Sequence, residues 1–170
     1  AVIQSEAKKL MTKEQLWDVL EDVKDPEIPV LSLIDLGVVR EIEIKDDVPH
    51  ITITPQYSGC PAMLEMENDI KKRLMAEGYK SVEVITVMTP TWTTDWITEK
   101  GKVALQEYGI APPEQSTSDK SALLGHPKQV TCPQCKSTET EMLSQFGSTP
   151  CKALYRCIDC LEPFDYFKCI

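Results

Sequence analysis

Apolar residues recur at helical spacing near the start of the chain and then switch to alternation. A helix is predicted over 12–23, because Thr12 and Gln15 form a capping-box signal and four apolar residues follow on one face: Leu16, Val19, Leu20 and Val23. Residues 38–53 instead alternate apolar and polar positions around a short polar turn, which predicts a hairpin.

Helical spacing returns after Pro61 and continues until Gly78, which is suited to the position just after a helix. A strand over 81–88 and a last helix over 98–108 follow. The order αββαβα predicts an α+β fold, with a small mixed sheet and helices on one of its faces.

The pattern fades over residues 111–128, which are rich in Pro, Ser and Thr and have the composition of a linker. Net charge divides at about the same place. The first 127 residues carry a net charge of −9, whereas the rest is balanced. We therefore expect an α+β domain over 1–110, a linker over 111–128 and a small, separately folding domain over 129–170.

The acidic balance, with 27 Asp and Glu against 18 Lys and Arg, disfavours a polyanion such as nucleic acid as the main partner. No run of apolar residues is long enough for a signal peptide or a membrane span. Paired cysteines in such a chain are more often metal ligands than disulfides. A cytoplasmic protein with no membrane partner is expected.

Two C-x2-C pairs near the end of the chain are the strongest local motif. Four thiolates presented by two such turns can surround Zn²⁺, and the metal supplies folding energy that a domain of about 40 residues lacks. The expected ligands are Cys132, Cys135, Cys157 and Cys160. Such a closed site is structural, and it predicts that residues 129–170 form a zinc-ribbon-like domain. Iron or an Fe–S cluster is the alternative, with Cys151 and Cys169 as additional ligands.

The same segment holds all three phenylalanines of the chain, together with two tyrosines. Part of this set is expected to pack around the metal. Because so small a domain cannot bury five aromatic rings by itself, Phe164, Tyr166 and Phe167 are predicted to form a docking patch for a protein partner.

The seventh cysteine, Cys60, lies at the predicted start of the second helix. The positive end of that helix should favour a reactive or metal-binding thiolate, although a small buried apolar role is equally open. Asp25, Glu27 and Asp35 occupy turn-forming segments. They either cap those turns or lie beside Cys60, where carboxylates would suit transiently bound iron and would oppose thiolate formation.

Motifs of self-sufficient catalysis are missing from the sequence. There is no Ser-His-Asp set, no glycine-rich phosphate loop and no HExxH helix, and the chain has only two histidines. We therefore expect no catalytic residues in this chain.

The motifs at 25–29, 35–37 and 58–61 resemble the signature of the metal–sulfur cluster biosynthesis family, to which SufT belongs. The segments at 92–96, 146–149 and 151–170 resemble the PaaD family, the D subunits of the phenylacetyl-CoA epoxidase system. The resemblance covers the chain from about Leu16 to its end. It implies an α+β first domain and a zinc-binding extension.

The resemblance also implies a function in aerobic phenylacetate degradation. The expected role is that of an accessory, non-catalytic component that helps the oxygenase or its reductase to acquire iron or an Fe–S cluster, with Cys60 as a transient ligand. The alternative is a structural subunit of the multicomponent oxygenase. Oxygenase and reductase subunits are the implied partners, and a homo-oligomer remains open.

Overall fold

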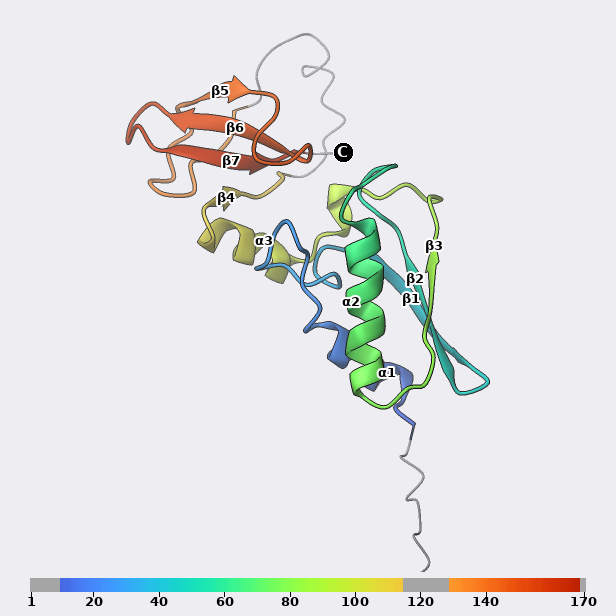
Figure 1. Ribbon diagram of the computed structural model, residues 1–170. Helices are drawn as coiled ribbons and strands as arrows, with labels where there is room; N and C mark the ends of the chain where they lie inside the picture. Colours follow the sequence, from blue (N-terminus) through green and yellow to red (C-terminus); the bar gives the residue numbers. More distant parts are fainter. Residues whose placement is uncertain (1–9, 115–128, 169–170) are drawn as a thin grey trace, which may run out of the picture.

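The computed structural model describes residues 10–114 and 129–168. Its helices and strands lie in two groups that are joined through a short strand, β4 (Figure 1). In chain order they are α1 (Lys13–Leu20), β1 (Val39–Lys45), β2 (Val48–Ile53), α2 (Met63–Ala76), β3 (Glu83–Thr86), the 3-10 helix η1 (Thr94–Trp96), α3 (Glu99–Glu107), β4 (Ile110–Ala111), β5 (Thr140–Ser144), β6 (Lys152–Cys157) and β7 (Pro163–Phe167).

The first domain confirms the predicted α+β class and the order αββαβα. Its sheet has the order β1-β2-β3, with β1 and β2 antiparallel and β2 and β3 parallel, so it is mixed as expected. The helices α1 and α2 pack against each other and against this sheet. By contrast, α3 packs against β4, where it connects the first domain to the second sheet.

The capping box at the start of α1 is present. The Gln15 side chain accepts the backbone N–H of Thr12 at 2.9 Å, and the Thr12 hydroxyl accepts that of Gln15 at 3.3 Å. The helix ends at Leu20, three residues earlier than predicted, because the chain then turns toward the segment at 25–29. Val23 remains buried from that turn, which explains its apolar spacing.

The second domain is a four-stranded sheet with the order β4-β7-β6-β5. The strands β5, β6 and β7 are antiparallel neighbours, whereas β4 comes from the end of α3 and pairs parallel to β7. The strand β4 thus crosses the expected boundary at 110/111 and adds the end of the first segment to the second sheet.

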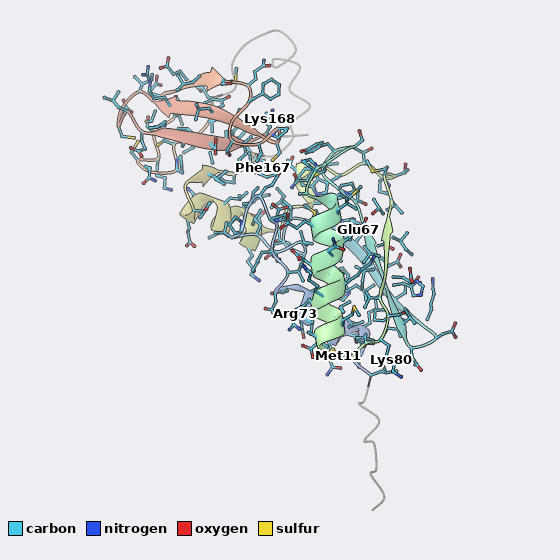
Figure 2. The ribbon with its side chains drawn as sticks, viewed as in Figure 1. Met11, Glu67, Arg73, Lys80, Phe167 and Lys168 are labelled. Atoms are coloured by element: carbon cyan, nitrogen blue, oxygen red, sulfur yellow. The ribbon has the colours of Figure 1, made fainter. Side chains whose placement is uncertain are left out.

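Two residues of the second domain belong to the core of the first. Cys151 and Phe167 are 1% and 0% exposed and are part of the same apolar cluster as α1, α2 and β2. In Figure 2, Phe167 lies at the end of β7 that faces the first domain. The two domains therefore share apolar packing, which departs from the expectation of two separate cores.

Trp92, whose ring packs against Phe167, lies in a segment that contacts the turn at 35–37 in two places. The indole N–H of Trp92 donates to the Leu36 carbonyl at 3.0 Å. Gly37 has a φ of +75°, and a Cβ there would lie 2.6 Å from the Cβ of Trp96. A side chain at position 37 would push these segments apart, so glycine is required.

No helix among the described residues is long and apolar enough to cross a membrane.

Candidate functional site: four clustered thiols and a separate thiol pair

The two C-x2-C pairs form matching turns. The first turn precedes β5, and the second joins β6 to β7. In each turn the residue after the second cysteine, Lys136 or Leu161, has a φ near +65°. The N–H of Lys136 donates to the carbonyl of Cys132 at 3.0 Å, and that of Cys157 to Glu162 at 3.0 Å. These tight turns point both cysteines of each pair toward the other pair.

The thiols of Cys132, Cys135, Cys157 and Cys160 all lie within 4.8 Å of one another. The sulfur atoms of Cys132 and Cys160 are 3.8 Å apart, and those of Cys135 and Cys157 are 3.5 Å apart. Sulfurs at the corners of a tetrahedron around a metal, each about 2.3 Å from it, would be about 3.8 Å apart. The observed spacing fits a tetrahedral thiolate metal site with all four positions filled by protein.

Cys151 does not belong to this cluster, which corrects its assignment as an additional ligand of the same metal. Its thiol lies 3.0 Å from the hydroxyl of Thr149, and the residue is packed in the first domain's core. Cys169 lies outside the described residues.

Cys60 lies in a turn that leads into α2. Its N–H donates to the Tyr57 carbonyl at 3.3 Å, and its carbonyl accepts the Met63 N–H at 3.2 Å. The N-cap of α2 is Ala62, so Cys60 precedes the cap by two residues and does not occupy it. The residue is 5% exposed.

The environment of Cys60 favours the neutral thiol. Burial raises the pKa of Cys60, and the negative charges of Glu27 and Asp25 raise it further, against the opposing effects of the Ala62 N–H and the Tyr57 hydroxyl. The expected lowering by the helix N-terminus is therefore wrong, because desolvation outweighs the single N–H group that reaches the sulfur.

Asp25 and Glu27 lie near enough to Cys60 for their negative charges to raise the pKa of its thiol. Asp25 is 2% exposed, and its Oδ1 accepts the N–H groups of Glu27 and Ile28, both at 2.8 Å. It therefore also builds the turn. Burial raises the pKa of both carboxyl groups, and the Lys152 ammonium opposes this effect at each.

Asp35, unlike Asp25 and Glu27, is bound to hydroxyl groups of the turn at 32–35 and of the start of α3. Its carboxylate accepts the hydroxyls of Ser32 at 2.9 Å and Thr98 at 2.7 Å, and Lys100 lies 3.5 Å away. Thr98 is the N-cap of α3, so Asp35 ties its own turn to the start of that helix. The carboxylates that act on Cys60 are Glu27 and Asp25, and Asp35 serves the fold.

The predicted docking patch is corrected as well. Phe164, Tyr166 and Phe167 are 5%, 4% and 0% exposed, so they cannot present a free surface. Tyr155 packs against Phe164 and Tyr166 with ring centroids 6.0 and 5.6 Å apart. These rings are buried because β4 and the first domain cover apolar surface that a ribbon alone would expose.

Two residues whose side chains act on this group of thiols and carboxylates, Tyr57 and Lys152, were not singled out from the sequence. The Tyr57 hydroxyl is inaccessible to solvent and lacks a hydrogen-bond partner of good geometry among the described residues. Burial and the neighbouring Cys60 thiol raise the pKa of Tyr57 to about 12. Lys152 is only 5% exposed. The sequence marks Lys152 in only one way: it directly follows Cys151 at the start of the strand β6.

A cavity of about 510 Å³ lies where the two domains meet. Glu27 lines it from the first domain, and Lys152, Ser148 and Asp165 line it from the second. The cavity is thus lined by Glu27, whose charge raises the pKa of Cys60 and of Cys151, and by Lys152, whose charge opposes the shift at Cys151.

Comparison with known proteins divides the chain in the same way. Residues 13–85 match the model of the iron-sulfur cluster assembly protein family, and residues 116–168 match that of the PaaD zinc beta ribbon domain. A protein of Escherichia coli K12, whose name places it among the D subunits of "Putative 1,2-phenylacetyl-CoA epoxidase", is 46% identical over 92% of both chains.

Two further similarities concern the first domain alone. The Fe-S protein maturation auxiliary factor YitW of Bacillus subtilis is 36% identical over 55% of this chain and 92% of its own. A crystal structure of a DUF59 domain of unknown function from Bacillus anthracis has a TM-score of 0.50 at 30% identity, and covers 55% of this chain and 90% of that one.

Proposed function

The chain belongs to the family of the D subunits of 1,2-phenylacetyl-CoA epoxidase, and from this membership we propose that it is an accessory, non-catalytic component of that epoxidase system. Its proposed task in phenylacetate degradation is to help the oxygenase or its reductase acquire iron or an Fe–S cluster. The observation that carries this proposal is the Cys60 thiol, which is buried beside Glu27 and Asp25 in a domain similar to Fe–S maturation factors.

The surroundings of Cys60 suit a temporary ligand. Negative charge nearby disfavours a free thiolate, whereas a bound cation neutralises that charge and stabilises the thiolate. The thiol therefore stays protonated and unreactive until iron or a cluster arrives, and it loses its proton on binding. Protonation of the sulfur on release would return the site to its resting state.

The four clustered thiols have a separate, structural task in this proposal. Their tetrahedral spacing and purely thiolate character suit Zn²⁺, which has no redox chemistry of its own. Four protein ligands leave no position open for substrate. We assign zinc here, and iron as the cargo of Cys60.

The partners in this proposal are the oxygenase and reductase subunits, which the chain would meet in the cytoplasm. Since Phe164, Tyr166 and Phe167 are buried, docking must use other surface. Exposed apolar side chains on the second domain are Met142, Leu143, Phe146, Ile158 and Leu161.

The deciding experiment replaces Cys60 by Ser in the host that uses phenylacetate. Serine is close in size to cysteine but is a poor ligand for iron, so the fold and the zinc should persist. We expect growth on phenylacetate to stop, with oxygenase and reductase subunits present at normal amounts but deficient in iron or cluster. A matched Ser58→Ala strain, altered at an exposed position of the same turn, should grow normally.

Normal growth and fully metallated client proteins in the Cys60→Ser strain would overturn the maturation function. A structural subunit of the oxygenase would then be the better description. In that case deletion of the whole chain should lower the yield of assembled oxygenase, while the metal content of each remaining subunit stays normal.

A further inference from the structure

The cavity where the two domains meet is built on one face of the second sheet. Lys152 and Leu154 lie in β6, and Leu154 is the register partner of Asp165 in β7. Because side chains alternate along a strand, these three residues share a face, and all three line the cavity. Phe167 shares this face and packs against Trp92 of the first domain. The face that carries Lys152 is therefore turned toward the first domain.

Lys152 carries a buried charge that no described residue neutralises by direct contact. The residue is 5% exposed, yet its ammonium group forms no ion pair or hydrogen bond with a residue that the structure describes. Its backbone is held firmly, since its carbonyl accepts the Gly147 N–H at 2.8 Å and its own N–H donates to the Thr149 carbonyl at 3.1 Å. A buried ammonium group is costly unless an anionic group pairs with it. The cavity therefore favours an anionic group at Lys152.

A carboxylate lines the same cavity from the first domain. The Glu27 side chain has no hydrogen-bond or ion-pair partner within residues 10–114 and 129–168. The charge of Lys152 counteracts the rise in pKa that burial causes at Glu27, so the two groups lie near each other without forming an ion pair. A ligand with an anionic group for the ammonium and a cationic donor for the carboxylate can bridge such a pair.

The rest of the lining suits a small organic molecule. The cavity has a volume of about 510 Å³, within the roughly 300–1,000 Å³ of small-molecule sites. Its apolar lining includes three residues: Ile110, Leu154 and Pro163. A second carboxylate, that of Asp165, accepts the Ser148 hydroxyl at 3.1 Å. One ammonium group and two carboxylates give the lining a net negative charge, which disfavours a simple anion and suits a zwitterion.

We propose that this cavity binds a free α-amino acid with an apolar side chain, whose carboxylate pairs with Lys152 and whose ammonium group pairs with Glu27. This inference goes beyond the proposed maturation function and does not depend on it, because Cys60 and the four clustered thiols are not among the residues that line the cavity. Since Glu27 belongs to the first domain and Lys152 to the second, the bound amino acid links the two domains and stabilises the folded chain.

The test is an NMR titration of the zinc-loaded full chain with L-leucine and two analogues that each lack one charged group. The analogue 4-methylpentanoate lacks the amino group, and 3-methylbutylamine lacks the carboxyl group. L-leucine should shift the amide signals of residues 108–110 and 152–154. Each analogue should bind at least about tenfold more weakly, because a hydrogen bond to a charged group contributes enough for such a factor.

The variant Lys152→Met removes the ammonium group, keeps an unbranched side chain, and should weaken L-leucine binding at least about tenfold. Lys13→Met is the matched control, because Lys13 is exposed and does not line the cavity, and it should bind L-leucine as the unaltered chain does. If Lys152→Met does not fold, the two analogues decide the matter in the unaltered chain.

Three results would overturn the amino-acid site. The first is no shift of these signals by L-leucine at millimolar concentration, which would mean that water alone fills the cavity. The second is equal binding of 4-methylpentanoate and L-leucine, which would mean a plain anion site. The third is undiminished L-leucine binding by a folded Lys152→Met chain.

Discussion

The rings of Trp92 and Phe167 pack against each other with centroids 6.2 Å apart and planes inclined at 52°. Trp92 precedes η1 in the first domain, and Phe167 ends β7 in the second. Both are almost fully buried and belong to the same apolar cluster, which also includes Cys60 and Cys151. Phe167 of the second domain is thus part of the first domain's core.

Removal of this contact should destabilise the whole chain. We expect Phe167→Ala to lower the free energy of unfolding by about 3 to 5 kcal/mol, the usual cost of truncating a buried aromatic ring. Urea unfolding followed by tryptophan fluorescence measures it, because all three tryptophans lie in the first domain. Phe146→Ala is the control: Phe146 is 67% exposed and should cost less than about 1 kcal/mol. Equal losses in the two variants would contradict the shared core.

Metal removal should affect both domains, in contrast to what a flexible linker alone predicts. A chelator that empties the four-thiol cluster should raise amide hydrogen exchange in β5 to β7 to nearly that of an unfolded chain. Exchange in β2 and α2 should also rise, because Phe167 and Cys151 then leave their core. An unchanged first domain would show that the junction contributes nothing to its stability. The variant Ile158→Ser, exposed between two of the cysteines, should keep the metal and normal exchange.

The reactivity of Cys60 should depend on pH in a direction set by its neighbours. Its raised pKa keeps the thiol protonated at neutral pH, so alkylation without metal should be slow and should accelerate as the pH rises toward that pKa. Glu27→Gln removes a charge that raises the pKa of Cys60, and should shift the rate profile to lower pH. Tyr57→Phe removes a group that lowers the same pKa, and should shift the profile to higher pH.

A control for this pair of variants is Glu67→Gln, whose side chain accepts a hydrogen bond from Thr86 at 2.9 Å on another part of the domain. It should leave the profile of Cys60 alkylation in place. Shifts of the Glu27 and Tyr57 variants in the same direction would contradict the electrostatic account of the site.

Asp35 should behave as a structural residue. Replacing it by Ala leaves the buried Ser32 hydroxyl and the N-cap hydroxyl of Thr98 without their charged acceptor, and should cost about 1 to 3 kcal/mol of unfolding free energy. Asp69→Ala is the comparison, because its ion pair with Lys72 is exposed and such pairs contribute about 0 to 1 kcal/mol. Calorimetry of both variants tests this. Iron-deficient client proteins in a strain with a folded Asp35→Ala chain would instead support an iron-associated role.

Much of the first domain could be predicted because its signals are local. The capping box at Thr12 and the alternation over 38–53 depend on neighbours a few residues away. The signal of the four clustered cysteines is also local, because two tight turns of fixed spacing are enough to present paired thiols. For these features the sequence by itself determined the structure.

The junction was decided by tertiary structure alone. Whether Phe167 is exposed or buried depends on the first domain's surface opposite it, and whether Cys151 serves the zinc cluster or packs in the first domain's core depends on which way its strand faces. The direction of the pKa shift at Cys60 likewise depends on burial, which outweighs the effect of the helix end. Spacing along the chain carries no information on such long-range contacts, because desolvation and packing arise only when distant segments meet.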